Sequence, residues 1–534
     1  MTETENLVLP RATEVDVMLL LEGTYPFVSG GVSSWVNQII RGFPEIRFGA
    51  VFIGSRPQDY GKPKYELAPN VVHLECHYVH SLAARPEIRA AAADPKATRT
   101  MEALHAYFRA NRARSGAPDP QAGGCPVAHD NAPLVHALTQ LSDSGALSQS
   151  QFLFGESAWR FIAENYRKFC TDPSFVDYFW TVRTMHAPVW ALSRIADKLI
   201  PARVYHTVST GYAGFLGALL KLRTQRPLLV SEHGIYTKER KIDLFQSDWI
   251  RDNRNVFERD SSEVAYFRDL WIRFFSAMGR ACYDQADHIV ALFESNRLRQ
   301  VADGAPDERT ENIPNGVNVK RLAPLRDKRP EVVPPVACLV GRVVPIKDIE
   351  TFVRAMRTIV NKFPKAEGWI AGPEDEDPQY AHDCKVLARG LGLEKNVKFL
   401  GFQRIDELMP KIGLVVLSSI SEGLPLVILE GYAAGVPTVS TDVGSCRQLV
   451  HGFGREDVAL GRSGRIVKIA DPEGLARACI ELLGDPQAWN EAQTAAIRRV
   501  EKYYTQEQMF ESYRTIYERL LATEGVPARV AGDA

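Results

Sequence analysis

The stretch Ser421-Glu422-Gly423-Leu424-Pro425-Leu426-Val427-Ile428-Leu429-Glu430 decides how the second half of this chain is interpreted. It follows Leu414-Val415-Val416-Leu417, a short apolar run typical of a strand buried in a parallel sheet. Pro425 suits the first turn of a helix, where its missing N–H group costs nothing. We therefore predict a helix over residues 426–434, ended by Gly435, and a strand-to-helix corner before it.

Two carboxylates flank this corner. Glu422 is expected in the loop above the sheet, and Glu430 about two turns down the helix. The first N–H groups of a helix have no partner within the helix, so they form a ready site for phosphate. The corner can thus hold a sugar hydroxyl, a diphosphate and a ribose, which outlines a nucleotide-sugar site. An acid/base pair is the alternative that two carboxylates also suggest.

Length and composition exclude several classes of protein. A chain of 534 residues is too long for one core, so two or three domains are expected. The net charge of -1 argues against a nucleic-acid partner, because nucleic-acid binders usually carry a strong basic excess. No apolar run approaches the roughly 18 residues needed to span a bilayer, and the polar first residues do not resemble a signal peptide. We expect a cytoplasmic protein.

The cysteines give no sign of a metal site. Metal sites usually show closely spaced pairs of cysteines, whereas these are scattered, so buried reduced thiols are expected and no metal or cofactor. The eight cysteines are at positions 76, 125, 170, 282, 338, 384, 446 and 479.

The first half opens as a Rossmann-like unit. A buried-strand run over 15–21 leads into a glycine loop that contains Gly30 and Gly31. A helix with one apolar face follows, formed by Val32, Trp35, Val36, Ile39 and Ile40. Strand–helix alternation is lost from about residue 80 to 180, which we interpret as a mostly helical insertion with a flexible loop over 115–133.

The second half alternates strands and helices more regularly. Strands are predicted over 337–340, 368–371, 397–400 and 414–417, and the proline-rich stretch 324–335 is predicted as an interdomain linker. Thr505, with Gln508 in capping-box position, begins a helix that needs a partner surface in either domain. The fold predicted is α/β, with two doubly wound parallel sheets and ligands at the carboxyl ends of their strands.

We divide the chain into three segments. Residues 1–320 form an N-terminal domain that contains the insertion, residues 321–504 form the nucleotide-sugar domain, and 505–534 form a terminal helix and tail.

Two cations follow the first strand of the second domain. Arg342 and Lys347 lie in a loop at the predicted carboxyl edge of the sheet. Arg offers a planar fork to phosphate oxygens and Lys a mobile point charge, so both can stabilise a departing diphosphate. In isolation they would be interpreted as solvated loop charges, but the Glu422–Glu430 corner in the same domain favours a phosphate site.

Together these motifs resemble the retaining glycosyltransferases of family 4, which have the GT-B fold of two Rossmann-like domains facing a cleft. The resemblance covers roughly 200 residues. It is carried by Gly341-Arg342 with Lys347, by Asn315-Gly316-Val317-Asn318, and by Ser421 to Pro425 followed by Glu430-Gly431-Tyr432-Ala433-Ala434-Gly435-Val436-Pro437.

The resemblance implies roles for individual residues in the second domain. Arg342 and Lys347 would bind the donor diphosphate, Glu422 the sugar hydroxyls, and Glu430 the ribose. Gly423 and Leu424 would line the donor site. The family usually has Gly-Gly and then Glu after the next strand, whereas this chain has Gly444-Ser445-Cys446-Arg447-Gln448, so no role is transferred to Gln448.

Three residues of the first domain complete the predicted site. Gly30 and Gly31 resemble the family's glycine loop that approaches the diphosphate, with a simple tight turn as the alternative. His233 resembles the His-Gly element near the donor sugar, with a structural histidine as the alternative. His206 and Glu294 also follow strands, but structural roles are favoured for both.

The front of the chain is most similar to the PelF group, cytoplasmic glycosyltransferases of the Pel exopolysaccharide machinery of biofilms. The similarity is carried by Glu22-Gly23-Thr24-Tyr25-Pro26, Gly30 to Trp35, the long insertion, and Glu232 to Arg240. It implies inner-membrane export proteins as partners, with peripheral attachment through them. On position alone, the insertion is the candidate docking surface.

The predicted enzyme is a glycosyltransferase that moves a hexose or N-acetylhexosamine from a UDP-sugar to a growing glycan, with retention. Arg342, Lys347, Glu422 and His233 are the candidate catalytic residues. Two alternatives remain, namely a UDP-sugar epimerase or hydrolase of the same fold, and a catalytically idle nucleotide-sugar sensor in a membrane export complex.

Overall fold

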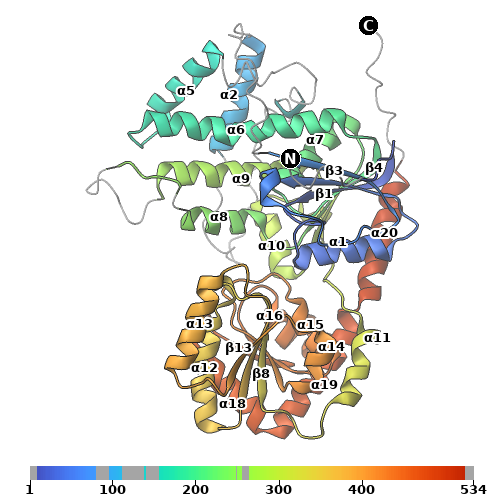
Figure 1. The fold of residues 1–534 in the computed structure, drawn as a ribbon. Helices are drawn as coiled ribbons and strands as arrows, with labels where there is room; N and C mark the ends of the chain where they lie inside the picture. The colour runs from blue at the N-terminus through green and yellow to red at the C-terminus, as the bar shows by residue number, and fades with distance from the viewer. Residues whose placement is uncertain are drawn as a thin grey trace. The chain divides into compact units, whose positions relative to one another are not determined.

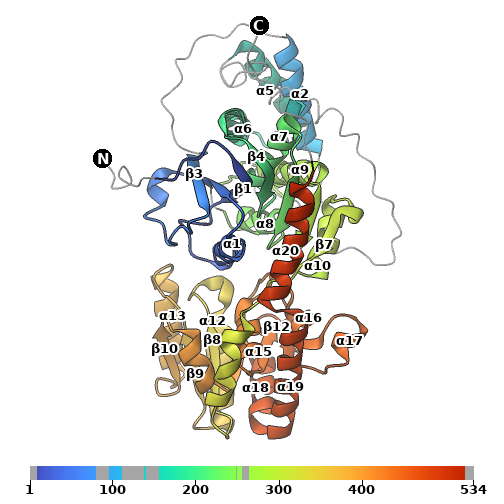
Figure 2. The same cartoon turned by 90° about the vertical axis from the view of Figure 1, so that its right-hand side faces the viewer.

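The computed structural model describes residues 9–79, 95–110, 137–139, 155–247, 249–254 and 264–523. The chain divides into two compact units, Met1–Asn312 with Ile516–Ala534, and Ile313–Thr515. Each unit is built on one parallel sheet flanked by helices (Figures 1 and 2). The prediction of two doubly wound α/β folds is confirmed.

The first unit contains a seven-stranded sheet in the order β3-β2-β1-β4-β5-β6-β7. All of its paired strands are parallel. Its strands are β1 (Val15–Glu22), β2 (Phe48–Gly54), β3 (Val71–Tyr78), β4 (Ala202–Thr207), β5 (Leu228–Glu232), β6 (His288–Ala291) and β7 (Thr310–Asn312). The helices between them are α1 (Gly31–Gly42), α7 (Tyr212–Thr224), α8 (Tyr236–Gln246), α9 (Tyr266–Gln285) and α10 (Glu294–Asp303).

Helix α1 forms because its apolar side chains recur on one face. Trp35, Val36, Ile39 and Ile40 are buried as predicted, whereas Val32 is only partly buried. Burying one such side chain stabilises the fold by about 2 kcal/mol, so this stripe fixes the helix against the sheet. The glycine loop before α1 is thereby held at the carboxyl end of β1.

The insertion in the first unit is helical where the structure describes it. It contributes α2 (Pro95–Ala110), α5 (Glu156–Phe169) and α6 (Phe175–Lys198). Helix α6 packs against α7 and α9, α2 packs against α9, and α5 packs against α2 and α6, around a shared aromatic core that includes Phe108, Phe161 and Phe274. The loop predicted over 115–133 lies outside the described residues.

The second unit contains a six-stranded sheet in the order β10-β9-β8-β11-β12-β13, and all of its pairs are parallel. Its strands are β8 (Val336–Val340), β9 (Glu367–Ala371), β10 (Val397–Gly401), β11 (Leu414–Leu417), β12 (Thr438–Thr441) and β13 (Gly464–Val467). The helices include α11 (Val319–Leu322), α12 (Ile349–Lys362), α13 (Pro378–Gly390), α14 (Ile405–Leu408), α15 (Leu426–Ala433), α16 (Cys446–His451), α17 (Gly454–Val458), α18 (Pro472–Gly484) and α19 (Pro486–Tyr503).

The order of the second sheet reverses between β8 and β11. The chain runs outward from β8 through β9 to β10, and then returns to the other side of β8 to form β11. Ligands of doubly wound sheets bind at such a switch point, beyond the carboxyl ends of the strands. The loops that follow β8 and β11 are those that carry Lys347 and Glu422.

The stretch 324–335 belongs to the second unit and is anchored to it. The Arg326 Nε donates to the carbonyl of Ala433 at 2.8 Å, and Arg329 Nη1 donates to the carbonyl of Met409 at 2.8 Å. The boundary between the units falls earlier, after Asn312, in place of the predicted linker.

The terminal helix α20 (Gln506–Leu521) has residues in both units. Its start is closed by the predicted capping box, in which Gln508 N donates to Thr505 Oγ1 at 3.2 Å and Thr505 N donates to Gln508 Oε1 at 3.3 Å. Tyr517, near its end, shares a 2.7 Å hydrogen bond with His206 Nδ1 in β4. His206 is therefore a buried structural histidine, as favoured from the sequence.

Candidate functional site

Lys347 and Glu422 meet at the switch point of the second sheet. The Lys347 Nζ donates to Glu422 Oε1 at 2.6 Å, and the two side chains are only 22% and 12% exposed. Ser419 Oγ donates to the same oxygen at 2.6 Å. A cation and a carboxylate that lie 75 residues apart in the chain thus form one partly buried group.

The two loops that carry this pair are also joined through their backbones. Ile420 N donates to the carbonyl of Ile346 at 2.9 Å, and Ser418 Oγ donates to the carbonyl of Lys347 at 2.9 Å. Sequence reasoning missed Ser418 and Ser419, although two hydroxyls directly after a buried strand could have indicated them. These bonds fix the loop of Lys347 against the loop of Glu422.

Arg342 lies in the same loop but has another partner. Its Nη1 donates to both carboxylate oxygens of Glu376, at 2.6 and 2.5 Å. The two side chains are about half exposed, so this pair exchanges readily with other ligands. Glu376 lies in the loop after β9, beside the Arg342 loop, and no motif pointed to it.

Gly423 and Leu424 shape the strand-to-helix corner. The carbonyl of Gly423 accepts the Ser445 amide at 2.9 Å and the Ser445 hydroxyl at 3.1 Å. Gly444 has a φ of +53°, and a Cβ there would lie 2.3 Å from the Glu422 and Gly423 carbonyl oxygens. Leu424 is buried. The segment after β12 therefore supports the corner through close backbone packing.

Helix α15 begins at Leu426, with Pro425 immediately before it as the N-cap. Glu430 is the fifth residue of this helix, a little more than one turn from its start, where the sequence suggested two. Burial raises the pKa of Glu430 to about 7, and the nearby Arg321 opposes that rise. A partly desolvated carboxylate of this kind gains from hydroxyl donors, which a ribose supplies.

The glycine loop and His233 are brought together in the first unit by Trp35. The Trp35 ring, on α1, lies 4.5 Å from the His233 ring between centroids, at 66°. Gly30 has an extended φ of 167° and Gly31 begins α1, and a Cβ at either would meet no atom within 4 Å. Nothing within the described residues therefore demands glycine at these two positions.

His233 is buried, and its Nε2 has no hydrogen-bond partner among the described residues. Burial lowers its pKa to about 3, so the ring is neutral at physiological pH.

Glu294, by contrast, accepts hydrogen bonds from Arg297 at 2.8 and 2.9 Å and also from Asn312, so it is structural. Gln448 Nε2 donates to the Tyr504 hydroxyl at 3.4 Å.

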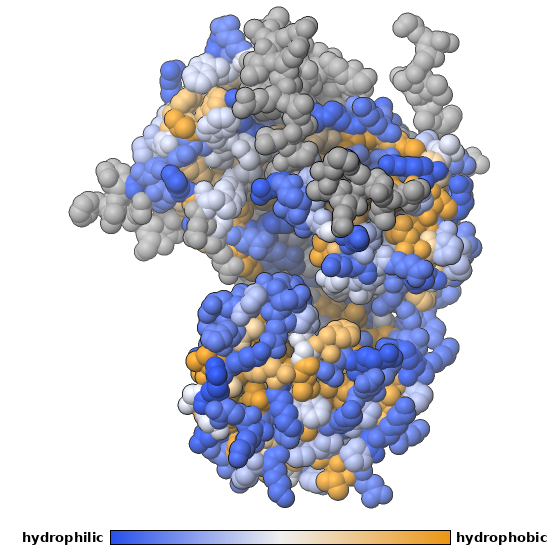
Figure 3. Space-filling view, viewed as in Figure 1, coloured by the Kyte–Doolittle hydropathy of each residue, from blue (hydrophilic) through white to orange (hydrophobic). Residues whose placement is uncertain are grey.

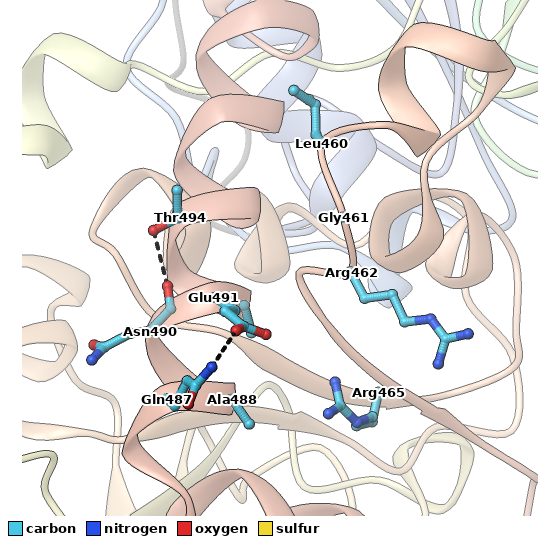
Figure 4. A pocket seen from close by; sticks show the side chains of 10 residues that line it. Leu460, Gly461, Arg462, Arg465, Gln487, Ala488, Asn490, Glu491 and Thr494 are labelled. Carbon is cyan, nitrogen blue, oxygen red and sulfur yellow. Dashed lines mark hydrogen bonds between the residues drawn. The ribbon is translucent and has the colours of Figure 1, made fainter.

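A pocket of about 840 Å³ lies elsewhere in the second unit (Figure 4). Arg462 and Arg465 line one side of it, and residues of α19 such as Gln487 and Glu491 line the other. It lies at the amino end of β13, whereas the Lys347–Glu422 group lies at the carboxyl edge of the same sheet. Because ligands of such sheets bind at the carboxyl edge, we do not assign the chemistry to this pocket.

The described residues carry neither a metal-binding cluster nor a membrane-spanning helix. They contain no group of three or more His, Cys, Asp or Glu side chains placed to hold a metal ion, and seven of the eight cysteines are free thiols there. Cys125 lies outside them. No described helix is both long and apolar enough to cross a bilayer. On the visible face of the second unit, hydrophilic side chains predominate with hydrophobic ones interspersed (Figure 3).

Comparisons with known proteins place the two units in families. Residues 15–308 match the family described as "Domain of unknown function (DUF3492)". Residues 334–485 match the family described as "Glycosyl transferases group 1", and this range contains Arg342, Lys347, Glu422 and Glu430.

Individual relatives agree with this assignment. The chain is 29% identical over 231 residues to the phosphatidyl-myo-inositol mannosyltransferase of Mycolicibacterium smegmatis, covering 42% of this chain and 55% of that protein. The chain spans between 18% and 55% of the length of the curated relatives that it matches.

Two solved structures share the fold. Sucrose-phosphate synthase from Thermosynechococcus elongatus superposes with a TM-score of 0.56 at 17% identity, covering 95% of this chain and 100% of that one. Anabaena Alr3699/HepE in complex with UDP and glucose gives a TM-score of 0.52 at 13% identity, covering 94% and 100%. The GT-B fold is therefore confirmed. The chain belongs to the DUF3492 family and carries a glycosyl transferases group 1 domain, which confirms the predicted glycosyltransferase class at the level of the domain family.

Proposed function

We propose that this chain transfers a hexose or N-acetylhexosamine from a UDP-sugar to a growing glycan, with retention at the anomeric carbon. The observation that carries the proposal is the 2.6 Å contact between Lys347 and Glu422 at the switch point of the second sheet. It brings together the cation that would bind phosphate and the carboxylate that would bind sugar hydroxyls, inside the matched glycosyl transferases domain.

The step that this site would catalyse exchanges one bond for another. The bond between the anomeric carbon and the diphosphate oxygen breaks, and the acceptor hydroxyl oxygen bonds to that carbon on the same face. The hydroxyl proton passes to the departing diphosphate. Arg342, Lys347 and the amides at the start of α15 would stabilise the charge that gathers on UDP, which is the largest contribution such sites make.

The remaining site residues would orient the donor. Glu422 would accept hydrogen bonds from the sugar hydroxyls and Glu430 from the ribose. The neutral His233 ring would lie near the sugar, and the open space at Gly30 and Gly31 supports a close backbone approach to the diphosphate. A chain of the same fold, Alr3699/HepE, has been crystallised with UDP and glucose, which supports a uridine donor.

We further propose a Pel-type exopolysaccharide as the product and a cytoplasmic location, with peripheral attachment to the inner membrane through export proteins. This part of the proposal rests on the resemblance of the front of the chain to the PelF group. No metal is proposed, because the two cations would supply the charge that a divalent ion supplies elsewhere.

The experiment is a turnover assay on single variants with a panel of UDP-sugars, GDP-sugars and candidate acceptors. Lys347→Ala and Arg342→Ala should each lower transfer from the preferred UDP-sugar by about 100-fold. Lys398→Ala is the matched control, because Lys398 pairs with Glu367 at 2.6 Å in the same unit but on strands β9 and β10. Near-normal transfer by both site variants, with an intact fold, would contradict the assignment.

The same assay separates the alternative activities. A glycosyltransferase forms product only when acceptor is present, whereas an epimerase or a hydrolase converts the donor alone. A nucleotide-sugar sensor would bind the donor and leave it intact under every condition.

A further inference from the structure

Glu232 is a buried acid that the proposed chemistry does not use. It is the last residue of β5, directly before His233, and only 1% of it is exposed. Its Oε1 accepts from Thr210 Oγ1 at 2.9 Å and from the Tyr236 amide at 3.0 Å. Its Oε2 accepts from the Tyr283 hydroxyl at 2.5 Å and from Gln300 Nε2 at 3.1 Å.

These four donors come from four different segments and are all uncharged. Thr210 precedes α7, Tyr236 begins α8, Tyr283 lies on α9 and Gln300 on α10. An ionised carboxylate is the side chain that offers about four acceptor sites and no donor. Glutamine at this position would direct an N–H group at one of these four donors, so it would break a hydrogen bond or force a hydroxyl to turn, whereas the carboxylate accepts from all four.

The carboxylate also closes the loop that carries His233. Tyr236 is four residues beyond Glu232, so their hydrogen bond spans the loop 233–235. Gly234 packs tightly inside this loop, because a Cβ there would lie 1.9 Å from Glu239 Oε1. The Tyr236 hydroxyl donates in turn to Glu22 Oε1 at 2.9 Å, at the end of β1.

The His233 ring is held by packing in a buried site. It packs against the Trp35 ring, and its buried Nε2 has no partner among the described residues. Its position therefore depends on this packing and on the backbone on either side of it, and Glu232 anchors that backbone at both ends of the loop. A displacement of about 1 Å in an active-site group can cost about 100-fold in rate.

We propose that Glu232 is the positioning residue of the site, whose carboxylate gathers four donors and fixes the loop that presents His233 to the donor sugar. The inference rests on the proposed function, and specifically on the role proposed there for His233. Glu232 does not touch the substrate itself.

The first test needs no catalysis. Hydrogen–deuterium exchange of the full chain should show faster exchange in the segment 233–240 of Glu232→Gln than of the wild type. Thr210→Val removes one donor and keeps the carboxylate, so it should speed exchange of the same segment by a smaller amount. It keeps the inference testable if Glu232→Gln fails to fold. Unchanged exchange of this segment in both variants would overturn the inference.

The second test asks whether Glu232 acts through His233. Glu232→Gln should lower kcat about 10- to 100-fold, with the donor KM changed less than about twofold. In a His233→Ala background, Glu232→Gln should cost no further activity, because the group that it positions is gone. Additive losses would show a general structural role and overturn the inference.

Glu75→Gln is the matched control in the same unit. Glu75 accepts hydrogen bonds from His73 at 2.9 Å and His77 at 2.8 Å on β3, away from the loop 233–235. It should change neither exchange of the segment 233–240 nor kcat. Wild-type turnover by His233→Ala would overturn the inference, since nothing would then need positioning. If the wild-type enzyme transfers no sugar from any donor tested, the proposed function is contradicted. The hydrogen–deuterium exchange result then tests only whether Glu232 fixes the loop 233–235.

Discussion

The raised pKa of Glu430 predicts that donor binding depends on pH. Burial lifts this pKa from its ordinary value of 4.5 to about 7. The carboxylate is then about one-tenth ionised at pH 6 and about nine-tenths ionised at pH 8. If the ribose hydroxyls bind the ionised form, the affinity for a UDP-sugar should fall about tenfold between pH 8 and pH 6.

The assay is calorimetric titration with a UDP-sugar, because its diphosphate is esterified at both ends and does not titrate in this range. Glu430→Gln is the matched variant, since it keeps the size of the side chain and removes the charge. We expect its affinity to be independent of pH and close to the wild-type value at pH 6. A wild-type affinity that is flat between pH 6 and 8, or a slope that survives in Glu430→Gln, would refute the reasoning.

The same carboxylate should affect folding stability in the opposite direction. Below pH 4.5 it is protonated in both the folded and the unfolded chain and costs nothing. As the pH rises to about 7, the unfolded chain ionises first, so the folded state loses up to about 3 kcal/mol of its relative stability. Glu430→Gln should lack this loss in denaturant titrations of the same pH series.

Glu430 also has a pKa that would suit an acid/base catalyst, which was the alternative interpretation of the two carboxylates. The two roles have different kinetic signatures. A ribose ligand raises the donor KM and Kd when it is replaced, whereas a proton-transfer group lowers kcat and leaves donor affinity unchanged. A Glu430→Gln enzyme with normal donor affinity and a kcat lowered by orders of magnitude would favour the acid/base interpretation.

Three further substitutions test the corner. Glu422→Ala should keep UDP affinity within about twofold by calorimetry and lower transfer about 100-fold in turnover assays. An equal loss of UDP affinity in Glu422→Ala and Glu430→Ala would show that the two carboxylates do not have separate roles. Glu376→Gln releases Arg342 and should tighten UDP about two- to threefold at low salt, and unchanged affinity would count against diphosphate binding by Arg342. Gly444→Ala should lower the melting temperature, because its Cβ would lie 2.3 Å from two carbonyl oxygens. Gly390→Ala is the neutral control, because a Cβ there meets no atom within 4 Å.

Most of the strands that the sequence did not predict are edge strands, and the exception is β12, which lies between β11 and β13. Strands β3 and β7 flank the first sheet and β13 flanks the second. A continuous apolar run arises when both faces of a strand are buried, whereas β7 consists of three polar residues, of which Glu311 is exposed and the other two are partly buried. Their pairing is decided by neighbours distant in the chain, so the local pattern cannot reveal it.

The placement of the candidate site residues was predictable where a motif carries its own geometry. Glycine loops, cations after strands and the strand-to-helix corner are local patterns, and the structure places each at the carboxyl end of a strand. Partners such as Glu376 and Ser445 carry no such pattern, because only the three-dimensional packing of their loops brings them to the site. The same is true of Glu232, whose four donors are distributed over 91 residues of chain, from Thr210 to Gln300.

If Lys347 binds the diphosphate and Glu422 the sugar, as proposed, their pairing links recognition of the diphosphate to recognition of the sugar. Each of the two side chains is mostly buried, so each needs a partner of opposite charge or a set of hydrogen bonds. A diphosphate that binds Lys347 competes directly with Glu422 for the ammonium group. Glu422 then keeps the hydroxyl of Ser419 and gains free acceptor sites for sugar hydroxyls. A free sugar offers nothing to Lys347 in exchange, so the sugar should be bound well only as part of a nucleotide diphosphate.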